Sequence, residues 1–265
     1  MSDGAFIMSQ EAYEQAQRNI QQTLGQSQTY SVPVRADGKP IVNPLVGIPL
    51  GRDTIADAMI FHCFLDIAAQ GWSRLKTDSN ATDMQRNIFA EEIRKAPEFI
   101  TDLVMLDADH RHGPNTVKQL VQDRLEHPEI GVIVGLNFRR REPFDPCVWI
   151  ERDGEKFQPV EWEQGLIGPL YRTGLASVII ARWVFEKVPA PWFANTYTLD
   201  TEGKIVYKRE DFYFSDKCRK HGVEMWCDTR VISPHTPNLQ NWVDSKWWKS
   251  FLQAHPDVVK ERVVE

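Results

Sequence analysis

The sequence predicts an α/β fold built around a mostly parallel sheet, and three observations support this prediction. Apolar runs such as DLVML (102–106) and IGVIVGLNF (130–138) lack the alternation of half-exposed strands, so we expect strands buried on both faces. Segments with helical periodicity separate these runs, as in parallel sheets covered by helices. Polar residues follow the strands directly, at the position where open α/β sheets bind ligands.

The first half of the chain supplies most of these elements. A strand is expected at PLVGIPLG (44–51) and a buried helix at 55–67. A second helix is expected at 83–96 with Asp83 as N-cap, and a third is expected to begin at Pro114. A strand near WSRLK (72–76) lacks a clear apolar run. Two regions flank the domain at 44–240: a polar helix and extended connector at 1–43, and a helical tail at 241–265 packed through Trp247 and Phe251.

The second half is more mixed and is expected to share the same sheet. Two hairpins are predicted, with turns at Asp153-Gly154 and around Gly203. Between them, RTGLASVIIARWVFEKV (172–188) indicates a buried strand that runs into a short helix. REDFYFSDKCRKHG (209–222) indicates a helix that ends at Gly222, and a last strand leads to His235.

Composition narrows the class of protein. The 265 residues are 42% hydrophobic and 26% charged, as in ordinary globular proteins. A net charge of −6 argues against a global basic field for nucleic acid or anionic membranes, although it leaves a local patch open. No apolar run approaches the roughly 20 residues of a spanning helix, and the N-terminus does not resemble a signal peptide. The four cysteines form no CxxC pair, so we expect a reducing cytoplasm.

Two carboxylates follow the strand at 102–106. Residues i and i+2 of an extended segment point the same way, so Asp107 and Asp109 are expected to address one point. Two oxygen ligands suit Mg²⁺ or Mn²⁺, and such a cation would stabilise a departing diphosphate. A polar turn that only ends the strand is the structural alternative. His110 and His112 are weaker ligand candidates, because loop histidines are more often solvated.

A second acidic pair opens the helix at 209–222. Glu210 and Asp211 lie where the helix dipole favours carboxylates, so capping alone would explain them. The functional interpretation is a general base that takes a proton from an acceptor hydroxyl.

The ordered set LDADH, VGLNFRRREPF, RTGLASVIIARWVFEKV, EDFYFSDKCRKHG and VISPHT resembles the GT-A fold glycosyltransferases of the family-two-like group, over roughly 44–236. The resemblance implies a GT-A-like α/β domain with a Rossmann-like nucleotide-binding half and a mixed acceptor-side half. It implies that Asp107 and Asp109 bind metal and diphosphate, that Asp211 with Glu210 is the catalytic base, and that His235 is a further metal ligand. Donor-binding positions would be Arg52, Asp83, Arg86, Asp107 and Gly174.

The expected function is therefore metal-dependent transfer of a sugar from a nucleoside-diphosphate sugar, such as a UDP- or GDP-sugar, to an acceptor hydroxyl with inversion. The acceptor (glycan, protein, lipid carrier or modified nucleic acid) is left open, and so is a retaining mechanism. Two other classes also stay open: a metal-dependent nucleotidyl or phosphoryl transferase, and a non-catalytic sugar-nucleotide or glycan-binding module. A phosphoaspartyl-transfer enzyme fits less well, because Arg111 stands where Thr or Val is expected.

Basic and aromatic residues have competing interpretations. Arg139, Arg140 and Arg141 follow a strand and could contact phosphates, although a solvated loop suits at least two of them better. Exposed aromatic residues such as Trp192 and Phe193 could stack on sugars or bases, whereas packing is the preferred interpretation for Trp247 and Phe251, which lie at helical spacing.

Overall fold

The computed structural model describes residues 42–49, 67, 71–77, 81–140, 144–159, 161–199, 202–238, 241–243, 248–250, 253 and 262–263. The expected helices at 9–25 and 55–67 (Ile67 apart) lie outside these residues, as do Arg52, Arg141, Trp247 and Phe251. No helix among the described residues is long and apolar enough to cross a membrane.

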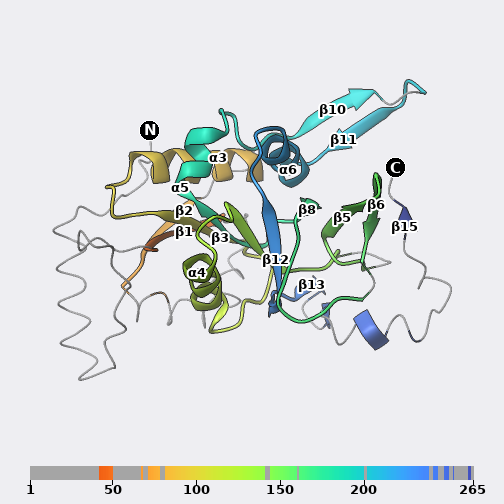
Figure 1. Cartoon of the computed structure of the whole chain (residues 1–265), viewed down its shortest axis with the longest axis horizontal. Coiled ribbons are helices and arrows are strands. Elements are labelled where there is room, and N and C mark those ends of the chain that lie inside the picture. The colour runs from red at the N-terminus through yellow and green to blue at the C-terminus, as the bar shows by residue number, and fades with distance from the viewer. Residues whose placement is uncertain are drawn as a thin grey trace.

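A seven-stranded sheet forms the centre of the molecule, in the order β2-β1-β3-β9-β4-β12-β7 (Figure 1). Its strands are β2 (Ser73–Thr77), β1 (Pro44–Pro49), β3 (Asp102–Leu106), β9 (Ser177–Ala181), β4 (Val132–Leu136), β12 (Met225–Ile232) and β7 (Leu166–Ile167). β1 pairs in parallel with β2 and β3, and β4 with β12, whereas β9 runs antiparallel to both of its neighbours. The predicted α/β class is confirmed: five of the seven strands in this shared sheet run in one direction, and β9 and β7 run against them.

Helices cover both faces of this sheet. On one face α3 (Thr82–Lys95) packs Phe89 and Ile93 against Leu103 and Met105 of β3. On the other face α4 (Thr116–Glu126) shares a core with the intervening residues of β3, Val104 and Leu106. Because successive strand residues point to opposite faces, a continuously apolar strand serves both layers. α5 (Arg182–Lys187) follows β9 directly, as predicted.

Two helix starts differ from the prediction. α3 begins at Thr82 with Ala81 at the N-cap, so Asp83 lies in the first turn rather than at the cap. α4 begins at Thr116, two residues after Pro114, because residues 114–115 form a turn. In both cases the helix exists where the periodicity placed it, and only its first residue shifts.

A second sheet, in the order β15-β6-β5-β8, lies beside the central one. It contains β15 (Arg262–Val263), β6 (Glu155–Gln158), β5 (Val148–Arg152) and β8 (Leu170–Thr173). The β5–β6 turn has positive φ at both Asp153 (55°) and Gly154 (81°), as the predicted tight hairpin requires. The second predicted hairpin is also present. Its strands β10 (Thr196–Leu199) and β11 (Ile205–Lys208) project from the body in Figure 1.

α6 (Glu210–Lys220) follows β11 and packs on β8, and β13 (His235–Asn238) pairs with β14 (Asn241–Val243). The aromatic residues of this half are core residues. Trp192 and Phe193 are each 1% exposed, and Phe193 stacks on Phe214 of α6 with ring centroids 4.6 Å apart. Packing, not stacking on a ligand, is therefore their role in this structure.

Candidate active site

The candidate site lies at one edge of the central sheet, where several chain segments converge. Asp107 follows β3, Arg140 follows β4 and His235 follows β12. Since these strands run in the same direction, their carboxyl ends meet at one edge. β9 runs the opposite way, so the loop at Gly174–Ala176 that precedes it also reaches this edge.

The two aspartates after β3 do not point to one place. The strand ends at Leu106, and Ala108 and Asp109 form a turn in which the His110 amide donates to the Asp107 carbonyl at 3.3 Å. The alternation of an extended strand is lost in that turn, so Asp107 and Asp109 find different partners. The expectation that both carboxylates address a single point is wrong for this reason.

Asp107 is ion-paired with a buried arginine. Arg86 of α3 is 2% exposed, and its Nη2 donates to Oδ1 and Oδ2 of Asp107 at 2.9 and 3.0 Å. Its Nη1 donates to the Leu175 carbonyl at 3.2 Å, and its Nε lies 3.7 Å from Oε1 of Glu210. Burial raises the pKa of Asp107 to about 7, although Arg86 acts to lower it. Arg86 therefore joins the turn after β3 to the first residue of α6.

The Glu210-Asp211 pair occupies the first turn of α6, as predicted. Glu210 is 3% exposed and lies between Arg86 and Arg209, whose Nε is 3.9 Å from Oε2. Asp211 accepts a hydrogen bond from the Phe212 amide at 2.8 Å, so it does satisfy a helix N–H group. Burial, with the Glu210 charge beside it, raises the pKa of Asp211 to about 6. A carboxylate with that pKa can both hold and release a proton near neutral pH.

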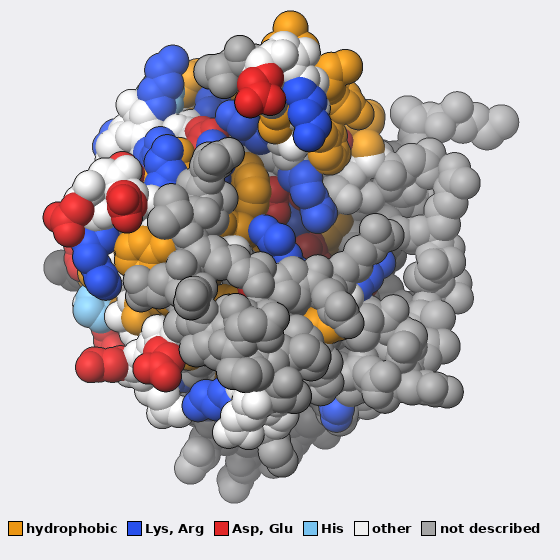
Figure 2. All heavy atoms as spheres, turned by 90° about the vertical axis from the view of Figure 1, so that its right-hand side faces the viewer, with side chains coloured by type: hydrophobic (Ala, Val, Ile, Leu, Met, Phe, Trp, Pro, Cys, Tyr) orange, Lys and Arg blue, Asp and Glu red, His pale blue; other side chains and the backbone are white. Residues whose placement is uncertain are grey.

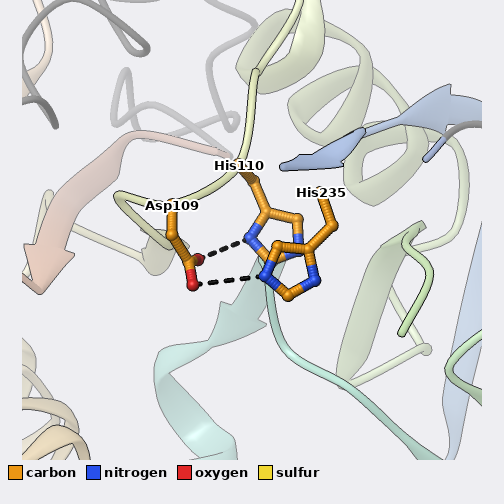
Figure 3. Close-up of side chains that lie close together, drawn as sticks. All are labelled: Asp109, His110 and His235. Atoms are coloured by element: carbon orange, nitrogen blue, oxygen red, sulfur yellow. Dashed lines mark hydrogen bonds and ion pairs between the residues drawn. The ribbon is translucent and has the colours of Figure 1, made fainter. Parts of the chain in front are cut away.

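Asp109, His110 and His235 form a cluster that could hold a cation (Figure 3). Their candidate ligand atoms all lie within 4.8 Å of one another. Asp109 Oδ1 is 2.8 Å from His110 Nδ1, and its Oδ2 is 3.3 Å from His235 Nε2. The imidazoles stack with centroids 4.0 Å apart, because the two histidine backbones pair in an antiparallel bridge. Asp107, which faces Arg86, is not part of this cluster.

The protonation of the cluster suits a cation. Burial lowers the pKa of His110 to about 4, so its ring is neutral at pH 7. Although burial acts to raise it, the hydrogen bond with His110 holds the pKa of Asp109 well below its usual range. His235 Nδ1 is 3.1 Å from the Phe138 carbonyl, and the donor Nε of Arg140 is 3.0 Å from Nε2. The carbonyl can only accept, so the proton is assigned to Nδ1, and the Nε2 lone pair accepts from Arg140.

The residues present fit a divalent cation. Ligands about 2.1 Å from a metal at right angles are separated by about 3 Å, close to the Asp109–His235 spacing. A metal-ligating histidine commonly donates its other ring N–H to a carbonyl, as His235 does to Phe138. His110 then orients the Asp109 carboxylate or adds a third ligand. The sequence had favoured His235 over His110, and the structure brings both to Asp109.

His112 has a structural role instead. It is 1% exposed, and its Nε2 lies 2.8 Å from the Asp107 carbonyl while its Nδ1 lies 2.9 Å from Ser233 Oγ. The carbonyl can only accept, so Nε2 carries the proton. His112 therefore fastens the turn after β3 to the end of β12.

Other predicted residues lie around this centre. Asp83 accepts from the Asn195 amide at 3.3 Å, which ties α3 to the segment before β10. A Cβ at Gly174 would lie 2.9 Å from Asn137 Oδ1 and 3.0 Å from Cys147 Cβ, so the close approach requires glycine. Arg140 was not singled out within its arginine run, yet it contacts both Asp109 and His235. Figure 2 shows acidic side chains recessed between basic ones on the face that it presents.

No protein-family model matches the chain, and no curated protein sequence matches it. Among solved structures, the chain is similar to the crystal structure of A197 from STIV, with a TM-score of 0.53 and 16% identity, over 77% of this chain and 91% of that one. At this identity the similarity concerns the fold alone.

Two weaker similarities have TM-scores below 0.5, too low to support an assignment. One is to CMP:2-keto-3-deoxy-manno-octonic acid synthetase with CTP (TM-score 0.42, 11% identity, 82% of this chain and 99% of that one). The other is to Drosophila beta-1,4-galactosyltransferase 7 with manganese, UDP-Gal and xylobiose (TM-score 0.39, 12% identity, 72% of this chain and 66% of that one).

Proposed function

We propose that this protein is a metal-dependent glycosyltransferase that moves a sugar from a nucleoside-diphosphate donor, such as a UDP- or GDP-sugar, to an acceptor hydroxyl with inversion. The observation that carries the proposal is the meeting of two functional groups at one sheet edge. One is the Asp109–His235 pair with the spacing of metal ligands, and the other is the half-buried Asp211 carboxylate with a pKa of about 6. Arg86 links the two groups through Asp107 and Glu210.

Asp109 and His235 would hold Mn²⁺ or Mg²⁺, with His110 beside them. The cation would supply positive charge against which a diphosphate can depart. Asp211 would take the proton of the acceptor hydroxyl as the acceptor oxygen bonds to the anomeric carbon. The bond from that carbon to the phosphate oxygen breaks in the same displacement, and the nucleoside diphosphate leaves with the electron pair.

The remaining predicted residues would serve the donor. Asp107, Gly174, Asp83 and Arg52 stay proposed donor-binding positions. Arg86 is too buried to contact a ligand directly, so we propose that it acts by positioning Asp107. The division into an N-terminal appendage (1–43), a catalytic domain (44–240) and a C-terminal tail (241–265) also remains a proposal, as does a cytoplasmic location.

The proposal is tested by incubating the protein with a panel of sugar nucleotides and Mn²⁺ and measuring the release of nucleoside diphosphate. Asp109→Ala should abolish Mn²⁺-dependent release while circular dichroism and the melting temperature stay near those of the parent. Asp153→Asn is the matched control, because this carboxylate is exposed in a hairpin turn and asparagine tolerates its positive φ.

Three outcomes would contradict the proposal. Activity that persists in the presence of a chelator would exclude a role for the metal in the reaction. Release of pyrophosphate instead of nucleoside diphosphate would identify a nucleotidyl transferase. Binding of a sugar nucleotide without turnover of any donor in the panel would favour a non-catalytic binding module.

A further inference from the structure

The Arg140 guanidinium occupies the two atoms on which the proposed cation depends. Its Nε donates to His235 Nε2 at 3.0 Å, and its Nη2 donates to Asp109 Oδ2. His235 Nε2 has a single lone pair, which can accept from Arg140 or bind a metal but not both. Occupation of this position by a cation and by the guanidinium is therefore mutually exclusive.

We propose that Arg140 is an exchangeable internal counter-ion: it neutralises the empty cation site, is displaced by the divalent metal, and then binds the diphosphate of the donor. This inference rests on the proposed function, and it deepens that function by making metal and donor binding interdependent through one side chain. An arginine suits both states, because its planar donors match a carboxylate and a phosphate equally well.

The surroundings of Arg140 allow its side chain to leave while its backbone stays. The side chain is 50% exposed, in contrast to the 2% of Arg86. The preceding residue is fixed, because the Arg139 amide donates to the Asp145 carbonyl at 2.9 Å. Phe138 is fixed in turn by the hydrogen bond between its carbonyl and His235. Displacement therefore needs only side-chain rotation on an anchored backbone.

The charges around the site explain why a counter-ion is needed. The charges of Asp109, Glu210 and Asp211 all act on Asp107, so four carboxyl groups gather at this edge. Arg86 and Arg209 lie beside Glu210, while Arg140 contacts Asp109 directly. A divalent cation brings more charge to the same oxygen, and the displaced guanidinium needs a new anion. The diphosphate of a donor provides one next to the metal.

Competition of this kind has a measurable consequence. The metal must first displace the guanidinium, so its apparent affinity falls by a factor set by the strength of the Arg140 contacts. For exposed ion pairs this factor is up to about five. A ligand that attracts the displaced guanidinium recovers part of that factor. Because linkage is reciprocal, nucleoside diphosphate should tighten Mn²⁺ binding and Mn²⁺ should tighten nucleotide binding, and both effects should depend on Arg140.

The test is equilibrium Mn²⁺ binding, followed by electron paramagnetic resonance of the free ion, with and without saturating UDP or GDP. Arg140→Ala should bind Mn²⁺ alone up to about five-fold more tightly than the parent, and the tightening by nucleotide should shrink. Arg139→Ala is the matched control. It removes a neighbouring charge of similar exposure (44%) that lies 4.0 Å from Asp145, and it should behave as the parent does. Asp109→Ala reports whether the ion binds at this site at all.

The outcomes separate this inference from the proposed function. If Asp109→Ala loses Mn²⁺ but Arg140→Ala binds it as the parent does, the metal site stands and the counter-ion role is wrong. If no variant binds Mn²⁺, or Asp109→Ala binds it normally, the metal part of the proposed function fails and the exchange fails with it. If nucleotide binds the parent equally well in a chelator and Arg140→Ala abolishes that binding, the guanidinium replaces the cation rather than yielding to it.

Discussion

Replacing Arg86 with methionine tests whether a single buried cation holds the candidate site together. The substitution keeps an unbranched side chain in the core but removes the donors to both oxygens of Asp107 and to the Leu175 carbonyl. It also removes the charge 3.7 Å from Glu210, which is itself almost fully buried. Asp107 and the Leu175 carbonyl then lose these donors in a low-dielectric environment, and Glu210 keeps only Arg209.

The expected loss in the free energy of unfolding is about 3 kcal/mol at pH 7.5. Breaking a buried ion pair by removing one partner costs about 3–5 kcal/mol, and the Asp107 side chain is 21% exposed, which favours the lower end. For a domain of this size that loss lowers the melting temperature by roughly 10 °C. Urea unfolding followed by tryptophan fluorescence measures it, with an unchanged m-value showing that the folded state is intact.

The dependence on pH provides a second check. The parent Asp107 has a pKa of about 7, above the unfolded value of 3.8, so its folded state binds more protons between these values. Without Arg86 that pKa rises further. Below pH 7 the group is protonated in both folded proteins, and the deficit of the variant shrinks. Above pH 7 Asp107 ionises readily only in the parent, so the deficit in the free energy of unfolding grows.

The double variant Arg86→Met, Asp107→Asn should recover part of the loss in the free energy of unfolding. A deficit under about 1 kcal/mol at pH 7.5, or one that grows on acidification, would refute the reasoning.

Three further predictions follow from other parts of the structure. Burial raises the pKa of Asp211 to about 6, so kcat/KM should fall as the pH drops below 6. Asp211→Asn should remove this acidic limb of the pH profile, and a limb that survives the substitution would exclude Asp211 as the base. Burial lowers the pKa of His112 from 6.5 to about 3, so below pH 6.5 the folded state binds fewer protons than the unfolded chain. Acidification should therefore lower the free energy of unfolding by at most about 1.4 kcal/mol per pH unit. In urea unfolding, the loss between pH 7 and pH 5 should be smaller in His112→Gln than in the parent, and equal losses would contradict this. Gly135→Ala should lower the free energy of unfolding by roughly 1–3 kcal/mol, because the added Cβ would lie 2.4 Å from Ser177 Oγ. The control Leu199→Ser changes a side chain that is 69% exposed and should alter this free energy by less than about 0.5 kcal/mol. Comparable losses in urea unfolding would show that Gly135 is not tightly packed.

Local patterns in the sequence predicted most of the fold. The run DLVML coincides with β3, and the Asp153-Gly154 pair forms the predicted turn, because both features depend on neighbouring residues alone. The strand at 73–77 was harder to predict, since it lies at the edge of the sheet and needs no continuous apolar run. The insertion of β9 antiparallel between β3 and β4 is a long-range pairing, which local periodicity does not encode.

The sequence predicted which residues lie at the candidate site better than it predicted which of them contact one another. Asp109, His235, Glu210 and Asp211 were all named from their positions after strands or at a helix start, and those positions are where the structure has them. The partner of Asp107 was not predicted, because Arg86 reaches it from a helix that precedes β3. The signal for Arg140 was present: it follows one parallel strand just as Asp109 follows another, so both reach the same sheet edge.

The two arginines that contact the turn after β3, Arg86 and Arg140, differ in burial, and this difference separates a structural role from an exchangeable one. Arg86 makes three kinds of contact inside the protein and has no route to solvent, so its loss should destabilise the fold. Arg140 makes its contacts at the surface, where water and salt compensate for its removal. Arg140→Ala should therefore change urea stability by less than about 1 kcal/mol while it changes Mn²⁺ binding. If Arg140→Ala instead destabilised the protein as much as Arg86→Met, the guanidinium would be a fixed part of the fold and could not yield its place to a metal.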